Sequence, residues 1–432
     1  MIDKIRKRAY RYSALGSAIA VALALTGCSG STSGGDSPGE QPAVKVLLFA
    51  GPYSTVAQQK LPEFEKATGI KVDLTILGGE VINQKISTEL LGGGTSYDVM
   101  SIRGDSMPFY GGNKTLADMS DFLKDSKLTP ASYELEDITP LMLDYYSWKG
   151  AQIGIPWTAD AYVMYYRTDL LEKAGLSGPP TSAEEYAEYA QKLTNAPEVY
   201  GTGLTMQRSH NLSSEYYQWL SIFGGAVVDD DGNAALDTPE AREALEFYVK
   251  LKDSAPPDVT NWAFERLTTG LSQGEVAMAV QWASVASVME DKSQSKVAGN
   301  MGYAPLPTSP NAASVVGGWG LSIPAASKNQ KNAFKFLQWM TGPEMTRELA
   351  ALGGGPARIS LLNDKELNEK YPWFQAQGQS FENAVPRPRT PGWPEIDDFM
   401  STELAQVVTG SLGQEEAIQK IAKKVEEIVA RK

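Results

Sequence analysis

Cysteine and histidine are almost absent from this chain of 432 residues, which contains one of each. A single cysteine cannot form an internal disulfide, so an exported domain of this sequence has to be stable without one. With a single histidine, His210 in MQRSHNLSS, neither a histidine-based metal site nor a Ser-His or Cys-His catalytic pair is expected. We therefore expect no metal and no cofactor, and we expect His210 to be a polar loop residue.

Positive charge and long apolar runs are also scarce. The chain has 39 Lys and Arg against 52 Asp and Glu, which gives a formal net charge of −13. The first 27 residues carry five of the basic side chains and one aspartate, which leaves −17 on the remainder. Such an acidic surface argues against nucleic acid and against electrostatic binding to anionic lipid. After residue 28 no apolar run is long enough to cross a bilayer.

The amino terminus has the pattern of an export signal. Five basic residues within 3–11 precede an uncharged, largely apolar run, 14–25, that is too short for a permanent membrane span. This order is typical of a signal peptide, which we place at 1–27. LTGC at 25–28 then resembles the lipobox of bacterial lipoproteins, which implies cleavage before Cys28 and lipid on its thiol. The alternatives are a buried core cysteine or an ordinary secretory signal.

Residues 28–42 are small and polar and contain almost no bulky apolar side chain. Such a segment cannot bury enough surface to offset the entropy of ordering it, so we predict a flexible tether. The chain beyond it is long enough for two large lobes.

Strand and helix patterns alternate after the tether. Apolar runs of strand length at 44–50, 70–77 and 97–102 are separated by apolar residues at helical spacing in 53–68 and 81–91. This alternation predicts an α/β lobe with a parallel sheet. Ligands bind at the carboxyl ends of such strands, so the loops after these three runs are candidate binding loops.

Later segments add helices and a turn. Apolar residues recur on one helical face in 331–341 and in 415–429. A third segment, VVDDDGNAAL at 227–236, places three aspartates and a glycine between apolar residues. A calcium loop is the alternative there, but the alternating aspartate spacing and the distal glutamate are missing, so a hairpin turn is expected.

Eight stretches together carry a family resemblance. They are LPEFEKATGIKV at 61–72, IGIPWTADAYVMYYRTDLLEKAGL at 153–176, GGAVVDDDG at 224–232, TPEAREALEFYVKL at 238–251, QGEVAMAVQWAS at 273–284, GYAPLP at 302–307, GGWGLSIPAASKN at 317–329, and PRPRTPGWPEIDDFMSTELAQVVTG at 386–410. In this order they resemble the family 1 extracellular solute-binding proteins of ABC importers, the maltose-binding-protein-like group. The sugar- and polyol-binding branches are the most similar.

The resemblance implies a two-lobed α/β fold of the type II periplasmic-binding-protein kind, with three hinge crossings and a ligand cleft between the lobes. The crossings are expected near 156–163, 306–317 and 358–361. The first lobe is then 43–156 with 317–358, and the second is 157–316 with 359–432.

The resemblance also implies a function. The protein would be a monomeric, lipid-anchored substrate-binding protein on the outer face of the bacterial cell membrane. It would capture a sugar or polyol by hinge closure, deliver it to the transmembrane subunits of an ABC permease, and do no chemistry on it.

Aromatic side chains are the first candidates for the site, because a ring face covers the C–H patch of a sugar at low entropic cost. Trp319 lies in GGWG, where three glycines clear the backbone around one ring; the alternative is a core tryptophan. Trp282 ends the strand-like VAMAVQW and either emerges into the cleft or stays in the core. Trp157 and Tyr53 are further candidates.

Charged side chains can bind two adjacent hydroxyls at once. Asp160 lies at the first expected crossing, where similar proteins often hold a hydroxyl pair; the alternative is a helix or turn cap. Arg387 in VPRPRTPGWP is stiffened by prolines on both sides, and related proteins direct an arginine of this loop at the ligand. Arg389 and Trp393 are alternatives to it, and a surface salt bridge is the competing interpretation.

Three more charged residues follow predicted strands. Asp105 and Arg103 come after 97–102, and Glu80 comes after 70–77. Many relatives have an acid where this chain has Arg103, so which of Arg103 and Asp105 contacts the ligand stays open.

Two other functions remain as alternatives. The same fold could bind an anionic or other non-sugar solute, such as a sugar phosphate, an amino acid derivative or a peptide, because Arg103, Arg387 and Arg389 would suit an anion. A secreted glycoside hydrolase would need two carboxylates about 5–10 Å apart, and the sequence neither indicates nor excludes such a pair.

Overall fold

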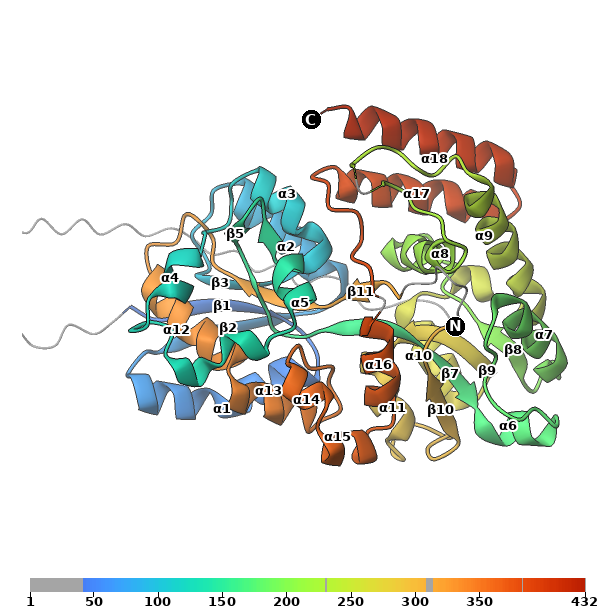
Figure 1. Ribbon diagram of the computed structural model, residues 1–432, viewed down its shortest axis with the longest axis horizontal. Helices are drawn as coiled ribbons and strands as arrows, with labels where there is room; N and C mark the ends of the chain where they lie inside the picture. Colours follow the sequence, from blue (N-terminus) through green and yellow to red (C-terminus); the bar gives the residue numbers. More distant parts are fainter. Residues whose placement is uncertain (1–41, 230, 308–313, 383, 432) are drawn as a thin grey trace, which may run out of the picture. The chain divides into compact units, whose positions relative to one another are not determined.

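The computed structural model describes residues 42–229, 231–307, 314–382 and 384–431 (Figure 1). The predicted signal peptide, the lipidation site Cys28 and nearly all of the predicted tether lie outside the described residues. The described chain has the predicted two-lobed α/β fold, with a separate sheet and a separate apolar core in each lobe.

The sheet of the first lobe has the strand order β2-β1-β3-β12-β6. These strands are β1 (Val44–Phe49), β2 (Val72–Leu77), β3 (Val99–Arg103), β6 (Ile155–Pro156) and β12 (Trp319–Ser322). Strand β1 pairs in parallel with both β2 and β3, as the alternating pattern predicts, whereas β12 is antiparallel to β3 and β6. The carboxyl end of β3 and the start of β12 therefore meet at one edge of the sheet.

The first lobe also contains most of the smaller elements. Its α-helices are α1 (Pro52–Thr68), α2 (Gly79–Leu91), α3 (Met107–Gly112), α4 (Ser120–Lys124), α5 (Pro140–Tyr145), α12 (Gln330–Thr341) and α13 (Pro343–Ala350). It further has the 3₁₀ turns η1 (Gly104–Ser106), η2 (Ala131–Tyr133) and η3 (Leu135–Asp137) and the hairpin β4 (Ser147–Trp148) and β5 (Ala151–Gln152). Buried residues such as Leu47, Ile86 and Phe334 form its core.

The sheet of the second lobe has the order β10-β7-β9-β8, and β11 pairs with the start of β7. These strands are β7 (Asp160–Arg167), β8 (Tyr200–Gly203), β9 (Val276–Trp282), β10 (Met301–Ala304) and β11 (Val316–Gly317). Strand β7 is antiparallel to β9, so the start of β7 lies beside the end of β9.

Helices surround this second sheet (Figure 1). They are α6 (Thr168–Lys173), α7 (Ala183–Leu193), α8 (His210–Ile222), α9 (Pro239–Lys250), α10 (Phe264–Gln273), α11 (Ala286–Glu290), α14 (Ile359–Leu362), α15 (Lys365–Lys370), α16 (Trp373–Glu382), α17 (Trp393–Val408) and α18 (Gln414–Val429), with the 3₁₀ turns η4 (Leu251–Ser254), η5 (Val259–Asn261) and η6 (Ala283–Val285). Helix α17 packs against both α8 and α18, which brings segments far apart in the sequence together.

The chain passes from one sheet to the other next to the predicted site residues. The passage from β6 to β7 takes only residues 157–159, and the passage from β11 to β12 takes only Gly318. Gly318 has φ 135°, and a Cβ there would lie 2.3 Å from the carbonyl oxygen of Thr158, so only glycine fits. Asp160 and Trp319 are therefore the first strand residues after two crossings.

Two smaller findings complete the fold. An antiparallel bridge joins Val228 and Ala234, as the predicted hairpin requires. Within the residues that the structure describes, no helix combines the length and the apolar character that crossing a membrane requires.

Candidate functional site

Trp319 and Trp282 are each supported by a second ring. Trp319 stacks on Phe49, with ring centroids 4.3 Å apart and 14° between the planes. Trp282 stacks on Tyr162, with centroids 4.0 Å apart and 28° between the planes. Both tryptophans remain half-buried rather than fully enclosed, so one face of each can still meet a solute. Their positions at a strand start and a strand end fit the predicted role.

The glycines around Trp319 serve other rings. A Cβ on Gly317 would lie 2.7 Å from the ring of Trp282, and one on Gly320 would lie 2.3 Å from the ring of Tyr146. Whether the glycines also clear space for Trp319 itself stays a prediction. They allow Trp282 and Tyr146 to approach the backbone on either side of it.

Trp157 and Tyr53 form a second aromatic pair, in edge contact at 5.9 Å between centroids. The Tyr53 hydroxyl accepts a hydrogen bond from the Gly355 N–H at 3.0 Å, and burial raises the pKa of Tyr53. Trp157 is only 2 % exposed, and its Nε1 makes no hydrogen bond within the described chain. The Trp157 ring is therefore buried, and its Nε1–H is left without an acceptor among the described residues.

Asp160 is a buried carboxyl at the start of β7. Its Oδ1 accepts from the backbone N–H groups of Ala161 at 3.0 Å and Ser284 at 3.2 Å, so the predicted alternative of a turn cap is present. Burial raises the pKa of Asp160 to about 7 despite these hydrogen bonds. One oxygen thus holds η6 in place, and the carboxyl as a whole gains its charge near neutral pH.

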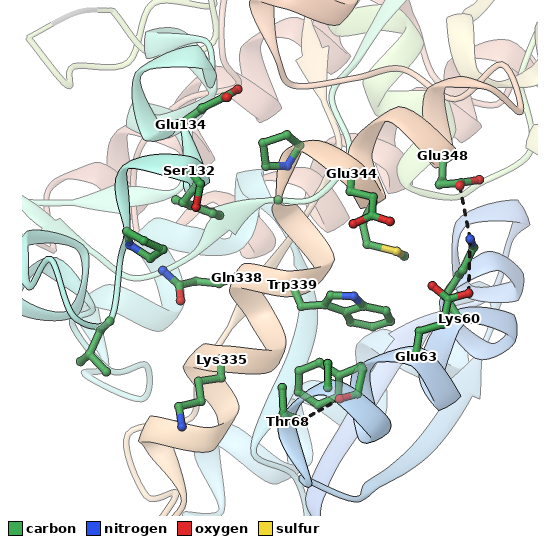
Figure 2. A pocket seen from close by; sticks show the side chains of 18 of the residues that line it. Lys60, Glu63, Thr68, Ser132, Glu134, Lys335, Gln338, Trp339, Glu344 and Glu348 are labelled. Atoms are coloured by element: carbon green, nitrogen blue, oxygen red, sulfur yellow. Dashed lines mark hydrogen bonds and ion pairs between the residues drawn. The ribbon is translucent and has the colours of Figure 1, made fainter.

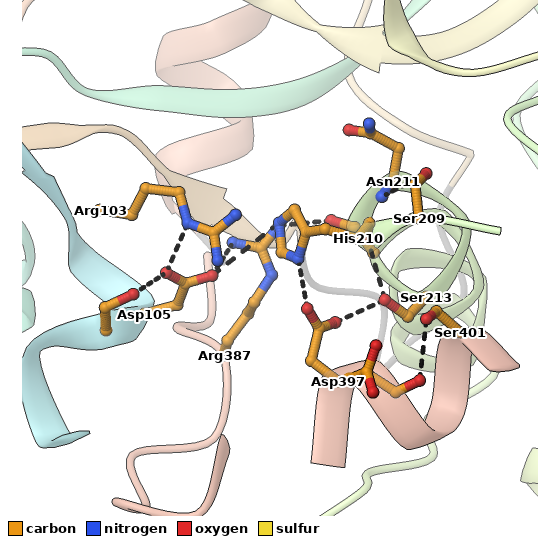
Figure 3. A network of polar contacts seen from close by, with 12 residues as sticks. Arg103, Asp105, Ser209, His210, Asn211, Ser213, Arg387, Asp397 and Ser401 are labelled. Atoms are coloured by element: carbon orange, nitrogen blue, oxygen red, sulfur yellow. Dashed lines mark hydrogen bonds and ion pairs between the residues drawn. The ribbon is translucent and has the colours of Figure 1, made fainter. Parts of the chain in front are cut away.

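Arg103, Asp105 and Arg387 meet between the two lobes (Figure 3). Arg103 Nε donates to Asp105 Oδ1 at 3.1 Å, and Arg387 Nη1 lies 3.6 Å from Asp105 Oδ2. Asp105 is 2 % exposed and Arg387 is 4 % exposed. Arg387 also donates to Ser214 Oγ, and its guanidinium lies 5.4 Å from the Trp282 ring centroid. The alternative of a surface salt bridge for Arg387 is therefore excluded.

His210 and Asp397 extend this network and were not predicted. His210 is the first residue of α8, so the expectation of a loop residue was wrong. Its Nδ1 lies 2.6 Å from Asp397 Oδ2, and its Nε2 lies 3.9 Å from Asp105 Oδ2. Ser209, whose side chain accepts from the Asn211 N–H as an N-cap, was the sequence signal that could have placed a helix start here.

The charges of this network balance. The guanidinium groups of Arg103 and Arg387 lower the pKa of Asp105 to about 2, outweighing burial, which alone would raise it. Burial would likewise raise the pKa of Asp397, but the neighbouring His210 and Ser213 hold it below its ordinary value. Two ionised carboxylates therefore face two guanidinium groups at neutral pH.

Several buried polar atoms around the network lack a hydrogen-bond partner in the described chain. They are Asp105 Oδ2 and Arg387 Nε, and Trp157 Nε1 of the Trp157–Tyr53 pair is unpaired as well. Each such atom costs about 1–3 kcal/mol when it stays unpaired, so a solute with several hydroxyl groups would gain by pairing them.

The remaining candidates lie elsewhere. Glu80 is in α2, but its side chain is outside what the structure describes. Trp393 is 2 % exposed and packs near Tyr217, which makes it a core residue. Arg389 donates to main-chain oxygens of Asp144 and Ser147 in the first lobe.

A separate pocket of about 700 Å³ lies in the first lobe, between α1, the segment 127–134, α12 and α13 (Figure 2). Phe64, Trp339 and Met345 line it together with charged side chains such as Lys60 and Glu344. It contains none of the predicted site residues. Across the described ranges, no group of three His, Cys, Asp or Glu residues is arranged to hold a metal ion.

Comparison with known proteins gives consistent results. The mannitol-binding protein of Pseudomonas aeruginosa is 30% identical over 285 residues, which cover 64% of this chain and 63% of that protein. A solute-binding protein of Agrobacterium radiobacter in complex with ribitol superposes with a TM-score of 0.83 at 26% identity, covering 90% of this chain and 99% of the other. A maltose-bound protein of T. maritima superposes with a TM-score of 0.81 at 27% identity, covering 89% and 100%.

The family model for bacterial extracellular solute-binding proteins matches residues 51–347, well over half of the chain. The match includes strands β2 to β12, and it contains eight of the nine predicted site residues, all except Arg387. With the fold and the arrangement between the lobes, this match shows that the chain belongs to the family of bacterial extracellular solute-binding proteins.

Proposed function

We propose that this protein captures a neutral sugar or polyol between its lobes and delivers it to an ABC permease. The observation that carries the proposal is the charge-balanced network of Arg103, Asp105, Arg387 and Asp397, flanked by Trp282. Carboxylate and guanidinium groups pair with adjacent hydroxyls, and a ring face covers the C–H side of the same molecule. The similar proteins that bind mannitol, ribitol and maltose support this class of solute.

An anionic solute is the weaker candidate. The two guanidinium groups that would attract it already face two ionised carboxylates, and Arg389 donates to main-chain oxygens of the first lobe. A phosphate would have to displace or protonate Asp105, whose pKa of about 2 makes protonation costly at neutral pH. A neutral solute leaves this balance intact.

Catalysis is not needed to explain the site, because the proteins of this family bind solutes rather than convert them. A glycoside hydrolase requires one carboxyl with a raised pKa opposite a second carboxylate across the scissile bond. Asp160 has a raised pKa, but Asp105 and Asp397 are held by arginine and histidine partners instead of being free to attack a sugar. The arrangement favours binding.

The mechanism we propose is hinge closure. The solute contacts Asp105 and Trp319 on the first lobe and Trp282 and Arg387 on the second. Because only the closed form offers both sets of contacts, the solute shifts the open–closed equilibrium by its extra affinity for that form. The proposed lobes are 43–156 with 317–358, and 157–316 with 359–432.

The amino-terminal sequence supports an extracytoplasmic location for the protein. We propose that residues 1–27 are removed, that Cys28 carries the lipid, and that residues 28–42 tether a monomeric binding domain to the outer face of the membrane. The family's extracellular character supports this placement.

Thermal melting of residues 29–432 tests the proposal. The panel should hold monosaccharides, disaccharides, polyols, sugar phosphates and amino acids. A solute present at 100 times its dissociation constant should add about 2.7 kcal/mol to the free energy of unfolding. A shift with a neutral sugar or polyol supports the proposal, whereas a shift confined to phosphorylated or zwitterionic compounds would show that the solute class is wrong.

A further inference from the structure

The segment between α16 and α17 contains Arg387 of the network in Figure 3 and, two residues later, Arg389, which ties the two lobes together at a second place. We call residues 385–391 the strap. The second lobe anchors both of its ends, because Val385 N–H donates to Ser314 O at 2.8 Å and α17, which follows the strap, packs against α8. Three prolines, at 386, 388 and 391, restrict the backbone of the strap. The strap is therefore a stiff part of the second lobe.

Arg389 of the strap reaches the first lobe. Its Nη1 donates to the main-chain oxygen of Asp144 at 2.5 Å, and its Nη2 donates to the main-chain oxygen of Ser147. The carboxylate of Asp144 adds an ion pair at 3.2 Å. Asp144 lies in the last turn of α5, and its main-chain oxygen also accepts from Ser147 Oγ at 2.9 Å, so Arg389 adds to an existing cap of this helix end.

The strap makes a second, apolar contact with the first lobe. Pro391 lies so near Gly112 of α3 that a Cβ on Gly112 would be 3.3 Å from Pro391 Cγ. Arg389 itself remains 24 % exposed. Its hydrogen bonds and ion pair go to Asp144 and Ser147, whereas Arg387, two residues earlier, contacts Asp105 and Ser214. The two arginines of the strap thus contact different parts of the first lobe.

We propose that Arg389 is a positioning residue that stabilises the closed form from outside the solute site and so sets the affinity for the solute. This inference rests on the proposed hinge closure. The contacts of Arg389 join the two lobes, so they exist only when the lobes are together. A contact made in one state alone shifts the equilibrium toward that state, and the apparent dissociation constant changes with the closed fraction.

Removing the guanidinium should therefore weaken binding without removing any contact to the solute. Hydrogen bonds from a charged donor predict that Arg389→Ala raises the dissociation constant about tenfold. The change should appear mainly as faster release, because the tie stabilises the closed form that holds the solute. Asp144→Ala should have a much smaller effect, because it keeps both main-chain oxygens and loses only the ion pair.

Single-molecule energy transfer between the lobes tests the inference. Residues 29–432 contain no cysteine, so Lys124→Cys in α4 and Lys423→Cys in α18 provide the only two dye positions, both on exposed side chains. The closed fraction is measured without solute and with ribitol, D-mannitol or maltose, in the parent chain and in the Arg389→Ala and Asp144→Ala variants. Arg431→Ala is the control, because Arg431 pairs with Glu395 inside the second lobe.

The inference predicts a closed fraction that falls in Arg389→Ala, with or without a solute, and that stays near the parent value in Asp144→Ala and Arg431→Ala. Equal closed fractions in the parent and Arg389→Ala would overturn it, as would a parent chain whose lobes never interconvert. If no probe binds but Arg389→Ala still lowers the closed fraction, the sugar or polyol assignment fails and the role of Arg389 stands.

Discussion

Trp319 is the residue on which the binding of a sugar face depends most. It stacks on Phe49 through one face and is half-buried at the edge of the first sheet. We predict that Trp319→Ala weakens solute binding by about 2 kcal/mol, roughly 30-fold, because an aromatic anchor at the centre of a site carries a large share of the binding energy. Titration of Trp319→Ala with the solute that binds most tightly in the thermal-melting panel measures this loss of affinity.

Trp339→Ala is the matched control for that variant. Trp339 is also a half-buried tryptophan of the first lobe, but it lines the pocket of Figure 2 and not the proposed site. Trp339→Ala should lower the melting temperature of the protein and leave its dissociation constant for the solute unchanged. Equal loss of affinity in both variants would mean that Trp319 acts only through the stability of its lobe.

Asp160 gives the protein a pH dependence of known sign. Burial raises its pKa in the folded chain to about 7, whereas the unfolded value is near 3.8. The unfolded chain therefore loses this proton first, and stability falls as pH rises from about 4 to about 7.

We predict that Asp160→Asn raises the free energy of unfolding at pH 8 by about 2–4 kcal/mol and flattens its dependence between pH 4 and 7. The amide oxygen can still accept the backbone hydrogen bonds from Ala161 and from Ser284 of η6. Solute binding should weaken, because an amide is a poorer acceptor for a hydroxyl pair. Denaturation at several pH values checks this, and a parent chain that is equally stable at pH 5 and pH 8 would contradict it.

At the scale of elements, the ion pair of Asp105 and Arg387 joins η1 of the first lobe to the strap of the second. Both side chains are almost fully buried. Removing the Asp105 carboxylate leaves the buried Arg387 guanidinium with less negative charge beside it. We therefore predict that Asp105→Asn lowers the free energy of unfolding by about 3 kcal/mol. Arg387→Gln should cost a similar amount.

The double variant tests whether the two residues act together. The double variant should lose less free energy of unfolding than the two single variants together, by about 1 kcal/mol or more. Each single change leaves the other charge buried without its partner. Chemical denaturation of the four proteins at neutral pH gives the coupling. Strict additivity would mean that the lobes are not held together by this pair.

The sequence could predict that several candidate site residues lie at or just beyond the ends of strands. The places of Trp282 at the end of β9 and of Asp105 after β3 followed from local apolar runs and their limits, whereas Trp319 was proposed from its neighbouring glycines and the family resemblance. His210 and Asp397 could not be predicted, because their meeting requires α8 and α17, 187 residues apart, to pack side by side. The contacts of Gly317 and Gly320 could not be predicted for the same reason, since the Trp282 and Tyr146 rings come from other elements.

At the scale of the whole molecule, the fold class could be predicted because the alternating pattern and the family stretches run through nearly the whole chain. The parallel order of β1, β2 and β3 follows from that alternation. The tie of the strap to α5 could not be foreseen, because Arg389 and Asp144 lie 245 residues apart. Contacts of this kind depend on how the two lobes meet.

The neutrality of the captured solute is the central claim, and it can be measured with matched pairs of compounds. Calorimetric titration of residues 29–432 would compare D-mannitol with mannitol 1-phosphate, ribitol with ribitol 5-phosphate, and glucose with glucose 6-phosphate. Because Asp105 and Asp397 already balance Arg103 and Arg387, we predict binding of a neutral member that changes little with salt, and no binding of its phosphate. Tight, strongly salt-dependent binding of a phosphorylated member alone would contradict the account.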